Sequence, residues 1–267
     1  MRQSTATILR RSRSCGPLLL LLLSLLCLTT PQPVRAGSFD YPLLAPSGRD
    51  AQTFLPNGWR LLDSATGDLN GDGRADLAFV IENDTIVSEA RGTGGGDLTM
   101  RSSPRILGIA FGGDEGYILS AQSHRVILRA VEGGTKGDPW AGLDITNGTL
   151  VVRFFGGSGW QWKLDYRFRY QDDDWYLVGA TSIDFHTGSG DIEVDDYDFV
   201  SGDVSITNGK MDKAACRKCA DCPECVGCAE CEECGGRSNT QNIGPIELPR
   251  LGEFEPSTME LIPGKFI

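Results

Sequence analysis

Residues 160–170 alternate strictly between large apolar side chains and polar or charged ones. A period of two over eleven residues is typical of a β-strand with one face in a core and the other in water. Asp172-Asp173-Asp174 then supplies a tight polar turn, and residues 175–183 return as a second apolar-rich strand. We therefore predict an antiparallel hairpin here. The apolar positions of its first strand are Trp160, Trp162, Leu164, Tyr166, Phe168 and Tyr170.

Short runs rich in β-branched and aromatic residues recur between residues 54 and 209, each bounded by turn residues. No segment of useful length shows the period of an α-helix, so an antiparallel sheet or sandwich is expected. A last strand is expected at residues 204–207, after an acidic connection at 188–198. The sequence thus predicts a mostly β chain with a single antiparallel, sandwich-like domain over residues 37–209. The other predicted strands are residues 77–82, 106–111, 125–131 and 149–155.

The amino terminus, residues 1–36, has the pattern of a signal peptide. Four arginines precede a leucine-rich stretch at 18–28, which is too short for a stable membrane anchor. Small or compact residues then predict cleavage after Ala36, and hence a secreted or periplasmic protein. A twin-arginine signal at Arg10-Arg11 fits less well because the hydrophobic positions after the pair are missing. Lipidation at Cys27 fits less well because leucine precedes it.

The mature chain is strongly acidic. The whole sequence has 36 acidic and 25 basic residues, and residues 1–36 contain five arginines and no acid. Cleavage therefore leaves 20 basic and 36 acidic residues, a net charge of −16. Such a surface repels nucleic-acid phosphate and anionic lipid headgroups, so we expect neither as a partner. No second long apolar run is present, so no membrane span is expected after cleavage.

The most specific motif is the acidic loop at residues 68–76, Asp-Leu-Asn-Gly-Asp-Gly-Arg-Ala-Asp. Oxygen-bearing side chains fall at loop positions 1, 3, 5 and 9, and Gly73 at position 6 permits a sharp bend. Calcium takes about six to eight oxygen ligands, which a loop can supply from alternate side chains and from the Arg74 carbonyl at position 7. The competing interpretation is an ordinary Asx/Gly turn held by side chain to backbone hydrogen bonds.

This loop departs from an EF-hand, because position 12 is Phe79 and not a bidentate glutamate. It resembles the calcium loops of integrin-type FG-GAP and VCBS repeats, where the same pattern runs directly into a strand. The resemblance covers about fifteen residues and occurs once, so the propeller fold of those families does not carry over. It implies a binding or adhesion module. The calcium ligands that it implies are Asp68, Asn70, Asp72 and Asp76 through their side chains and Arg74 through its backbone carbonyl.

A cysteine ladder occupies the segment 210–236, with one cysteine at every third residue and few large apolar side chains. In polyproline II geometry this spacing would place every thiol on one edge. An oxidising compartment favours disulfides, with one of the seven cysteines left over, whereas the regular Cys-x-x-Cys repetition favours zinc or copper(I). A proline-containing tail, expected to be extended, follows at 237–267. The ladder consists of Cys216, Cys219, Cys222, Cys225, Cys228, Cys231 and Cys234.

Catalytic motifs are sparse, and the sequence favours a non-enzymatic function. The only histidines, His124 and His186, lie in strand-like stretches. Residues 156–159 lack the final glycine of a nucleophile elbow, since Trp160 follows them. Paired carboxylates are so abundant that they single out no acid/base pair. The acidic clusters are expected to be solvated.

Three functions follow from these patterns. The leading hypothesis is an exported calcium-binding protein that acts as a binding or adhesion module toward a macromolecular or carbohydrate partner. The alternative is a protein that sequesters zinc or copper(I) through the cysteine ladder. The third is a carbohydrate-active enzyme with Trp160, Trp162 and Trp175 lining a sugar site.

Overall fold

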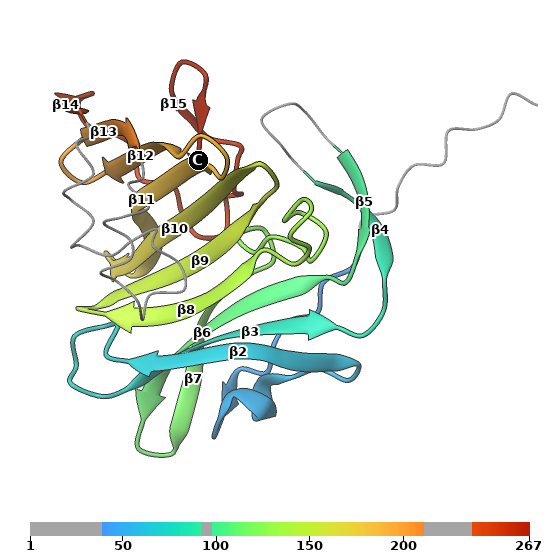
Figure 1. Cartoon of the computed structure of the whole chain (residues 1–267). Helices are drawn as coiled ribbons and strands as arrows, with labels where there is room; N and C mark the ends of the chain where they lie inside the picture. The colour runs from blue at the N-terminus through green and yellow to red at the C-terminus, as the bar shows by residue number, and fades with distance from the viewer. Residues whose placement is uncertain (1–38, 92–97, 211–236) are drawn as a thin grey trace, which may run out of the picture. The chain divides into compact units, whose positions relative to one another are not determined.

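The computed structural model describes residues 39–91, 98–210 and 237–267 (Figure 1). The predicted signal peptide, its cleavage after Ala36 and the cysteine ladder lie outside these residues. The described residues form β-strands and one 3-10 turn, η1 (Ala51–Phe54), with no α-helix, which confirms the mostly β prediction. Within the described ranges, no helix has the length and apolar character needed to cross a membrane.

The first sheet is antiparallel and has five strands in the order β1-β7-β6-β3-β2. Its strand β3, which lies between β6 and β2, is buried at seven consecutive positions. Even-numbered residues such as Val80 join one apolar cluster, and odd-numbered residues such as Phe79 join a second cluster on the other face. A strand covered on both faces has no need of polar alternation, which explains its continuous apolar sequence. The strands are β1 (Ser47–Gly48), β2 (Trp59–Gly67), β3 (Asp76–Asn83), β6 (Arg105–Gly113) and β7 (Gly116–Ser123).

The second sheet is an antiparallel meander of seven strands that curls into a half-barrel (Figure 1). Each strand pairs with its neighbour in sequence, from β8 to β14, and the connections from β8 to β13 are hairpins. Local pairing of this kind needs no long crossover connection. The strands are β8 (Trp140–Thr146), β9 (Thr149–Gly157), β10 (Trp160–Gln171), β11 (Asp174–His186), β12 (Asp191–Asp198), β13 (Asp203–Lys210) and β14 (Arg237–Asn242).

The predicted hairpin is confirmed as β10 and β11. Gln171 pairs with Asp174 at its tip, and Asp172 and Asp173 form the two-residue turn with φ of 50° and 60°. Aspartate tolerates this left-handed conformation better than most residues, because its short side chain bonds the local backbone. The predicted alternation holds in the middle of β10, where Leu164, Tyr166 and Phe168 are buried, but not at its start, where Trp160 is exposed.

The larger apolar cluster joins the two sheets. It contains Val80 and Ile109 from the first sheet together with Phe154 and Tyr166 from the second. Strands β2 and β8 also meet directly, because the backbone N–H of Leu143 donates to the Asp63 carboxylate at 3.1 Å. The described residues therefore share one main core.

The segment 237–267, expected to be an extended tail, packs into this core. Its first strand, β14, extends the half-barrel. The Leu177 N–H donates to the Pro249 carbonyl at 2.9 Å, and Leu251, Phe254 and Ile267 are buried in the main cluster. Two small hairpins complete the structure, β4 (Val87–Arg91) with β5 (Leu98–Ser102) and β15 (Glu260–Ile262) with β16 (Lys265–Phe266).

Two local predictions are wrong. Residues 125–131 form no strand: Val126 to Arg129 are four consecutive buried residues in irregular chain, without the alternation of a half-buried strand. The predicted acidic connection at 188–198 contains strand β12, in which Ile192 and Val194 alternate with acidic residues. The period-two alternation was missed because the acidic residues of this strand are typical of a solvated connection. Strands β2, β7, β8 and β14 were not predicted either.

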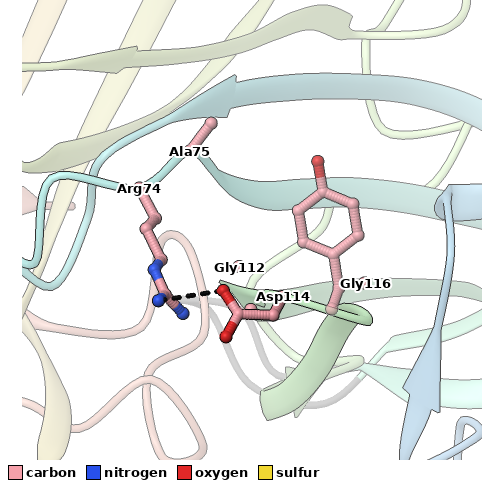
Figure 2. A pocket seen from close by; sticks show the side chains of 7 residues that line it. Arg74, Ala75, Gly112, Asp114 and Gly116 are labelled. Atoms are coloured by element: carbon pink, nitrogen blue, oxygen red, sulfur yellow. Dashed lines mark ion pairs between the residues drawn. The ribbon is translucent and has the colours of Figure 1, made fainter.

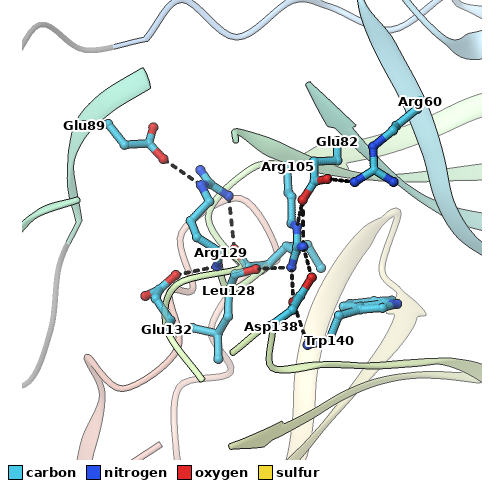
Figure 3. A network of polar contacts seen from close by, with 10 residues as sticks. Arg60, Glu82, Glu89, Arg105, Leu128, Arg129, Glu132, Asp138 and Trp140 are labelled. Carbon is cyan, nitrogen blue, oxygen red and sulfur yellow. Dashed lines mark hydrogen bonds and ion pairs between the residues drawn. The ribbon is translucent and has the colours of Figure 1, made fainter. Parts of the chain in front are cut away.

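Two buried arginines hold the irregular segment to the sheets (Figure 3). Arg105 on β6 is fully buried, and it pairs with Glu82 on β3 and with Asp138. It also donates to the Leu128 carbonyl at 3.0 Å, which lies in the segment predicted to be a strand. Arg129, also fully buried, donates to Glu89 on β4 at 2.6 Å. The bond from Arg105 satisfies a backbone carbonyl that a strand would have paired.

Candidate functional site

The predicted calcium loop connects β2 to β3. The side chains at loop positions 1, 3 and 5, which are Asp68, Asn70 and Asp72, fold back over the loop. Asp68 accepts hydrogen bonds from the backbone N–H of Gly71 at 2.7 Å and of Gly73 at 3.0 Å. Gly71 and Gly73 have φ of 78° and 82°, the left-handed region that favours glycine. The two glycines therefore permit the curl that these bonds close.

Asn70 and Asp72 continue the same pattern along the loop. Asn70 Oδ1 accepts from the N–H of Asp72 at 2.9 Å, and Asp72 Oδ1 accepts from the N–H of Arg74 at 2.8 Å. The Asn70 amide also donates to Asp72 Oδ2 at 3.3 Å. The structure thus brings the side chains at positions 1, 3 and 5 together with the backbone of the same short curl.

Asp76 differs from the other loop aspartates because it is fully buried. Its Oδ2 accepts from the N–H groups of Leu69 at 2.7 Å and Asn70 at 3.2 Å. Its Oδ1 accepts from the N–H of Gly112 on β6 at 2.8 Å. The carboxylate therefore fastens the start of the loop to a neighbouring strand, and it satisfies three backbone donors. The sequence motif contains no signal for this anchoring role.

The charges of the loop are poorly balanced. Among the described residues, no lysine, arginine or histidine forms an ion pair with Asp68, Asp72 or Asp76, whereas Arg74 pairs with Asp114 at 3.0 Å. The described part of the chain also contains no group of three or more His, Cys, Asp or Glu side chains placed to hold a metal ion. An ion in this loop would therefore rely on amide and carbonyl oxygens beside the carboxylates.

A groove lies beside the loop, between its end and the β6–β7 turn (Figure 2). A cavity of about 340 Å³ there is lined by Arg74, Ala75, Gly112, Gly113, Asp114, Gly116 and Tyr117. A second cavity of about 880 Å³ shares Tyr117 and part of the turn with the first, and extends to β1 and η1. Figure 2 shows the Arg74 guanidinium and the Asp114 carboxylate, which both line the first cavity, facing each other.

The other singled-out residues do not assemble into a catalytic site. His124 stacks on Tyr41 with ring centroids 3.9 Å apart, and His186 bonds Ser189. Trp175 is 2% exposed and belongs to the core, so it cannot line a sugar site together with Trp160, which is 53% exposed.

The cysteine ladder lies outside the described residues, but the strands on either side of it are described. Strand β13 ends at Lys210 and β14 begins at Arg237, and Asn208 pairs directly with Arg237. The ladder therefore connects two adjacent strands of one sheet.

No family model, curated protein or solved structure matches this chain. The resemblance to FG-GAP and VCBS calcium loops therefore stays at the level of one motif. The function has to be inferred from the geometry of the chain's own residues.

Proposed function

We propose that this chain is an exported calcium-binding module whose loop at residues 68–76 holds the ion and braces an adjacent binding groove. The observation that carries the proposal is the arrangement of Asp68, Asn70 and Asp72. Their side chains fold into one curl, and no cation from the described residues neutralises the two carboxylates. Carboxylate and amide oxygens are the ligands that calcium prefers.

The proposed coordination uses oxygens that each keep a free lone pair. A carboxylate or amide oxygen that accepts one N–H can still coordinate a cation, because it has two lone pairs. Asp68, Asn70 and Asp72 would contribute side-chain oxygens and the Arg74 carbonyl a fourth ligand. Asp76 Oδ2 already accepts two N–H groups, so it would coordinate the ion only in exchange for one of these bonds. Water would complete the shell of six to eight oxygens.

Arg74 links the ion to the groove. Its carbonyl belongs to the proposed coordination shell, and its guanidinium pairs with Asp114 at the groove's edge. An ion that fixes the Arg74 backbone would therefore fix the position of this side chain. The groove combines charged residues with Tyr117 and the 65% exposed Ile118, a mixture suited to a macromolecular or carbohydrate partner.

Thermal unfolding with calcium and with chelator tests the calcium site. A ligand that binds only the native state stabilises it, by about 2.7 kcal/mol at a hundred times its Kd. The wild type should melt higher in calcium, and Asp72→Ala should abolish this increase. Asp84→Ala removes an exposed aspartate outside the loop and should retain the increase. A wild-type melting temperature indifferent to both calcium and chelator would show that the loop is an ordinary turn.

A second candidate function is binding of zinc or copper(I) by the cysteine ladder, for which the Cys-x-x-Cys repetition is the argument and the pairing of β13 with β14 offers a direct test. Because Asn208 and Arg237 are direct partners, a two-residue Asn-Gly turn can replace the whole intervening segment. The shortened protein should keep its fold and its melting temperature. If the ladder binds metal, the shortened protein should also lose all zinc and copper, measured by elemental analysis of the exported protein. Unchanged metal content would remove this candidate, and oxidised thiols in the full chain would favour disulfides.

A further inference from the structure

The core-facing side of the half-barrel changes character along its strands. Toward one end, Tyr166, Ala180, Tyr197 and Val204 lie opposite one another on β10 to β13, and each is at most 1% exposed. Residues directly opposite one another on neighbouring strands share a face. Four residues farther along each strand, the same face carries Trp162, Asp184, Glu193 and Asn208, again directly opposite one another. Three of these four residues are polar or acidic.

Three carboxylates crowd this polar end. Asp184 lies directly opposite Glu193, and Asp195 is two residues from Glu193 on the same face of β12. Opposed like charges destabilise a sheet unless a cation lies between them. Lys265 of the carboxy-terminal hairpin supplies one cation, with its ammonium 2.8 Å from Glu193 and also bonded to Asp195.

One ammonium does not balance three carboxylates. Asp184 forms no ion pair with a described residue; it accepts a hydrogen bond from the Ser182 hydroxyl at 3.5 Å, and Lys265 attracts it only from a longer distance. Burial, with Glu193 and Asp195 adding to it, raises the pKa of Asp184. Asp195 is 6% exposed, and its Oδ1 has no hydrogen-bond partner. This end of the sheet therefore has a buried acceptor and a surplus of negative charge.

An open cavity of about 320 Å³ adjoins two of the carboxylates, and Lys265 is not among the residues that line it. Asp184, which forms no ion pair in the described chain, lines this cavity, and so does Glu193, of which one oxygen bonds Lys265. The side chain of Trp160, a 53% exposed residue, forms part of its wall. Asp191 also lines it, but pairs with Lys210 at 3.0 Å. This combination suits an alkylammonium ion, because the carboxylates can pair with its charge and the aromatic face can pack against its methylenes.

We propose that this cavity binds a primary ammonium group of the lysine type, carried by a cationic partner protein. The ammonium would donate to Asp184 and to the second oxygen of Glu193, while its methylenes pack on Trp160. Lys265 shows the same chemistry within the chain, since its ammonium bonds two carboxylates of the same cluster. A metal ion suits the site less well, because no described group of three acidic, histidine or cysteine side chains is placed to hold one. The proposal is independent of the calcium loop, which lies on the other sheet.

The test follows the indole N–H signal of Trp160 by NMR while the blocked amino acid N-acetyl-lysine-methylamide is titrated into the full-length protein. The norleucine analogue has nearly the same shape without the charge. The lysine probe should shift the signal saturably, and the norleucine probe should not. Asp184→Asn should weaken the binding of the lysine probe at least tenfold. Asp173→Asn makes the same acid-to-amide change in an exposed turn and should bind like the wild type.

Three results would overturn the proposal. The first is no saturable shift with the lysine probe, and the second is equal binding by wild type and Asp184→Asn. The third is a calcium-induced shift that competes with the lysine probe and is lost in Asp184→Asn, which would make the cavity a general cation site. Asp184→Asn relieves like-charge repulsion, so it should fold; a melting temperature no lower than that of the wild type would show that lost binding is not lost structure.

Discussion

The backbone N–H of Gly112 donates to Oδ1 of Asp76 at 2.8 Å, and this bond joins the proposed calcium loop to the β6–β7 hairpin. The two strands, β3 and β6, are hydrogen-bonded neighbours, and the bond extends their contact beyond the last paired residues, Leu77 and Ala110. The β6–β7 turn also lines the groove beside the loop. Any change at this junction should therefore affect both the loop and the groove.

Gly112 itself gives the first prediction. A Cβ at this position would lie 2.2 Å from the Ala75 carbonyl, so Gly112→Ala must push the loop away from β6. Overpacking of this kind costs about 1–3 kcal/mol of unfolding free energy. Gly113→Ala is the matched control, because its Cβ would lie 3.4 Å from the nearest atom. Urea denaturation of both variants should show a loss only for Gly112→Ala, and equal losses would contradict the tight contact.

Variants at Asp76 and Asp72 separate the anchoring of the loop to β6 from ion binding. Asp76→Ala removes the acceptor of three backbone donors, of which the Leu69 N–H is buried and the other two are partly buried. A buried donor left unsatisfied costs about 1–3 kcal/mol, so the variant should be clearly destabilised even in chelator. Asp72→Ala disturbs an exposed position and should cost less than about 1 kcal/mol in chelator. Denaturant midpoints measured without calcium distinguish the two. A mild effect of Asp76→Ala would mean that water replaces the carboxylate.

The buried arginine network gives a third prediction with its own control. Arg105→Met removes the buried partner of Glu82 and Asp138, and breaking a buried pair costs about 3–5 kcal/mol. Arg60 pairs with the same Glu82, but its side chain is 57% exposed. Arg60→Met should therefore cost less than about 1 kcal/mol. Thermal melts at neutral pH check both, and a larger loss for Arg60→Met would reverse their assigned roles.

The sequence predicted those features that depend on local pattern. The β10–β11 hairpin follows from an alternation that needs no knowledge of the rest of the chain. The glycines and aspartates of residues 68–76 were likewise enough to predict a loop there that leads directly into a strand. Its anchoring was not predictable, because Gly112 is 36 positions from Asp76 and its backbone N–H carries no sequence signal.

Strand β12 shows why other features escaped prediction. Its core-facing positions include Glu193 and Asp195, which a hydrophobic pattern assigns to solvent. They are tolerated there because Lys265, 70 residues after Asp195, supplies their counter-charge. The strand prediction for residues 125–131 is wrong for the opposite reason. Its apolar residues predict a strand, but the buried Arg105 takes the Leu128 carbonyl and leaves the segment irregular. Both outcomes depend on contacts between residues far apart in sequence.

The last prediction concerns pH and Asp184. Burial raises the pKa of this carboxyl, with Glu193 and Asp195 adding to the effect, so the folded state holds its proton more tightly than the unfolded chain. Its ionisation therefore lowers the free energy of unfolding as pH rises from the ordinary aspartate value of 3.8 through the raised pKa. Asp184→Asn removes this loss, and should be more stable than the wild type at neutral pH by up to about 1 kcal/mol, the size of a cross-strand charge effect.

The difference between the two proteins should disappear below pH 3.8, where the wild-type carboxyl is protonated in both the folded and the unfolded state. Urea unfolding at a series of pH values measures it, with Asp173→Asn as an exposed control that should follow the wild type throughout. If Asp184→Asn were less stable than the wild type at neutral pH, Asp184 would have a favourable partner in the folded state. The surplus negative charge that makes the adjoining cavity attractive to an ammonium ion would then be absent.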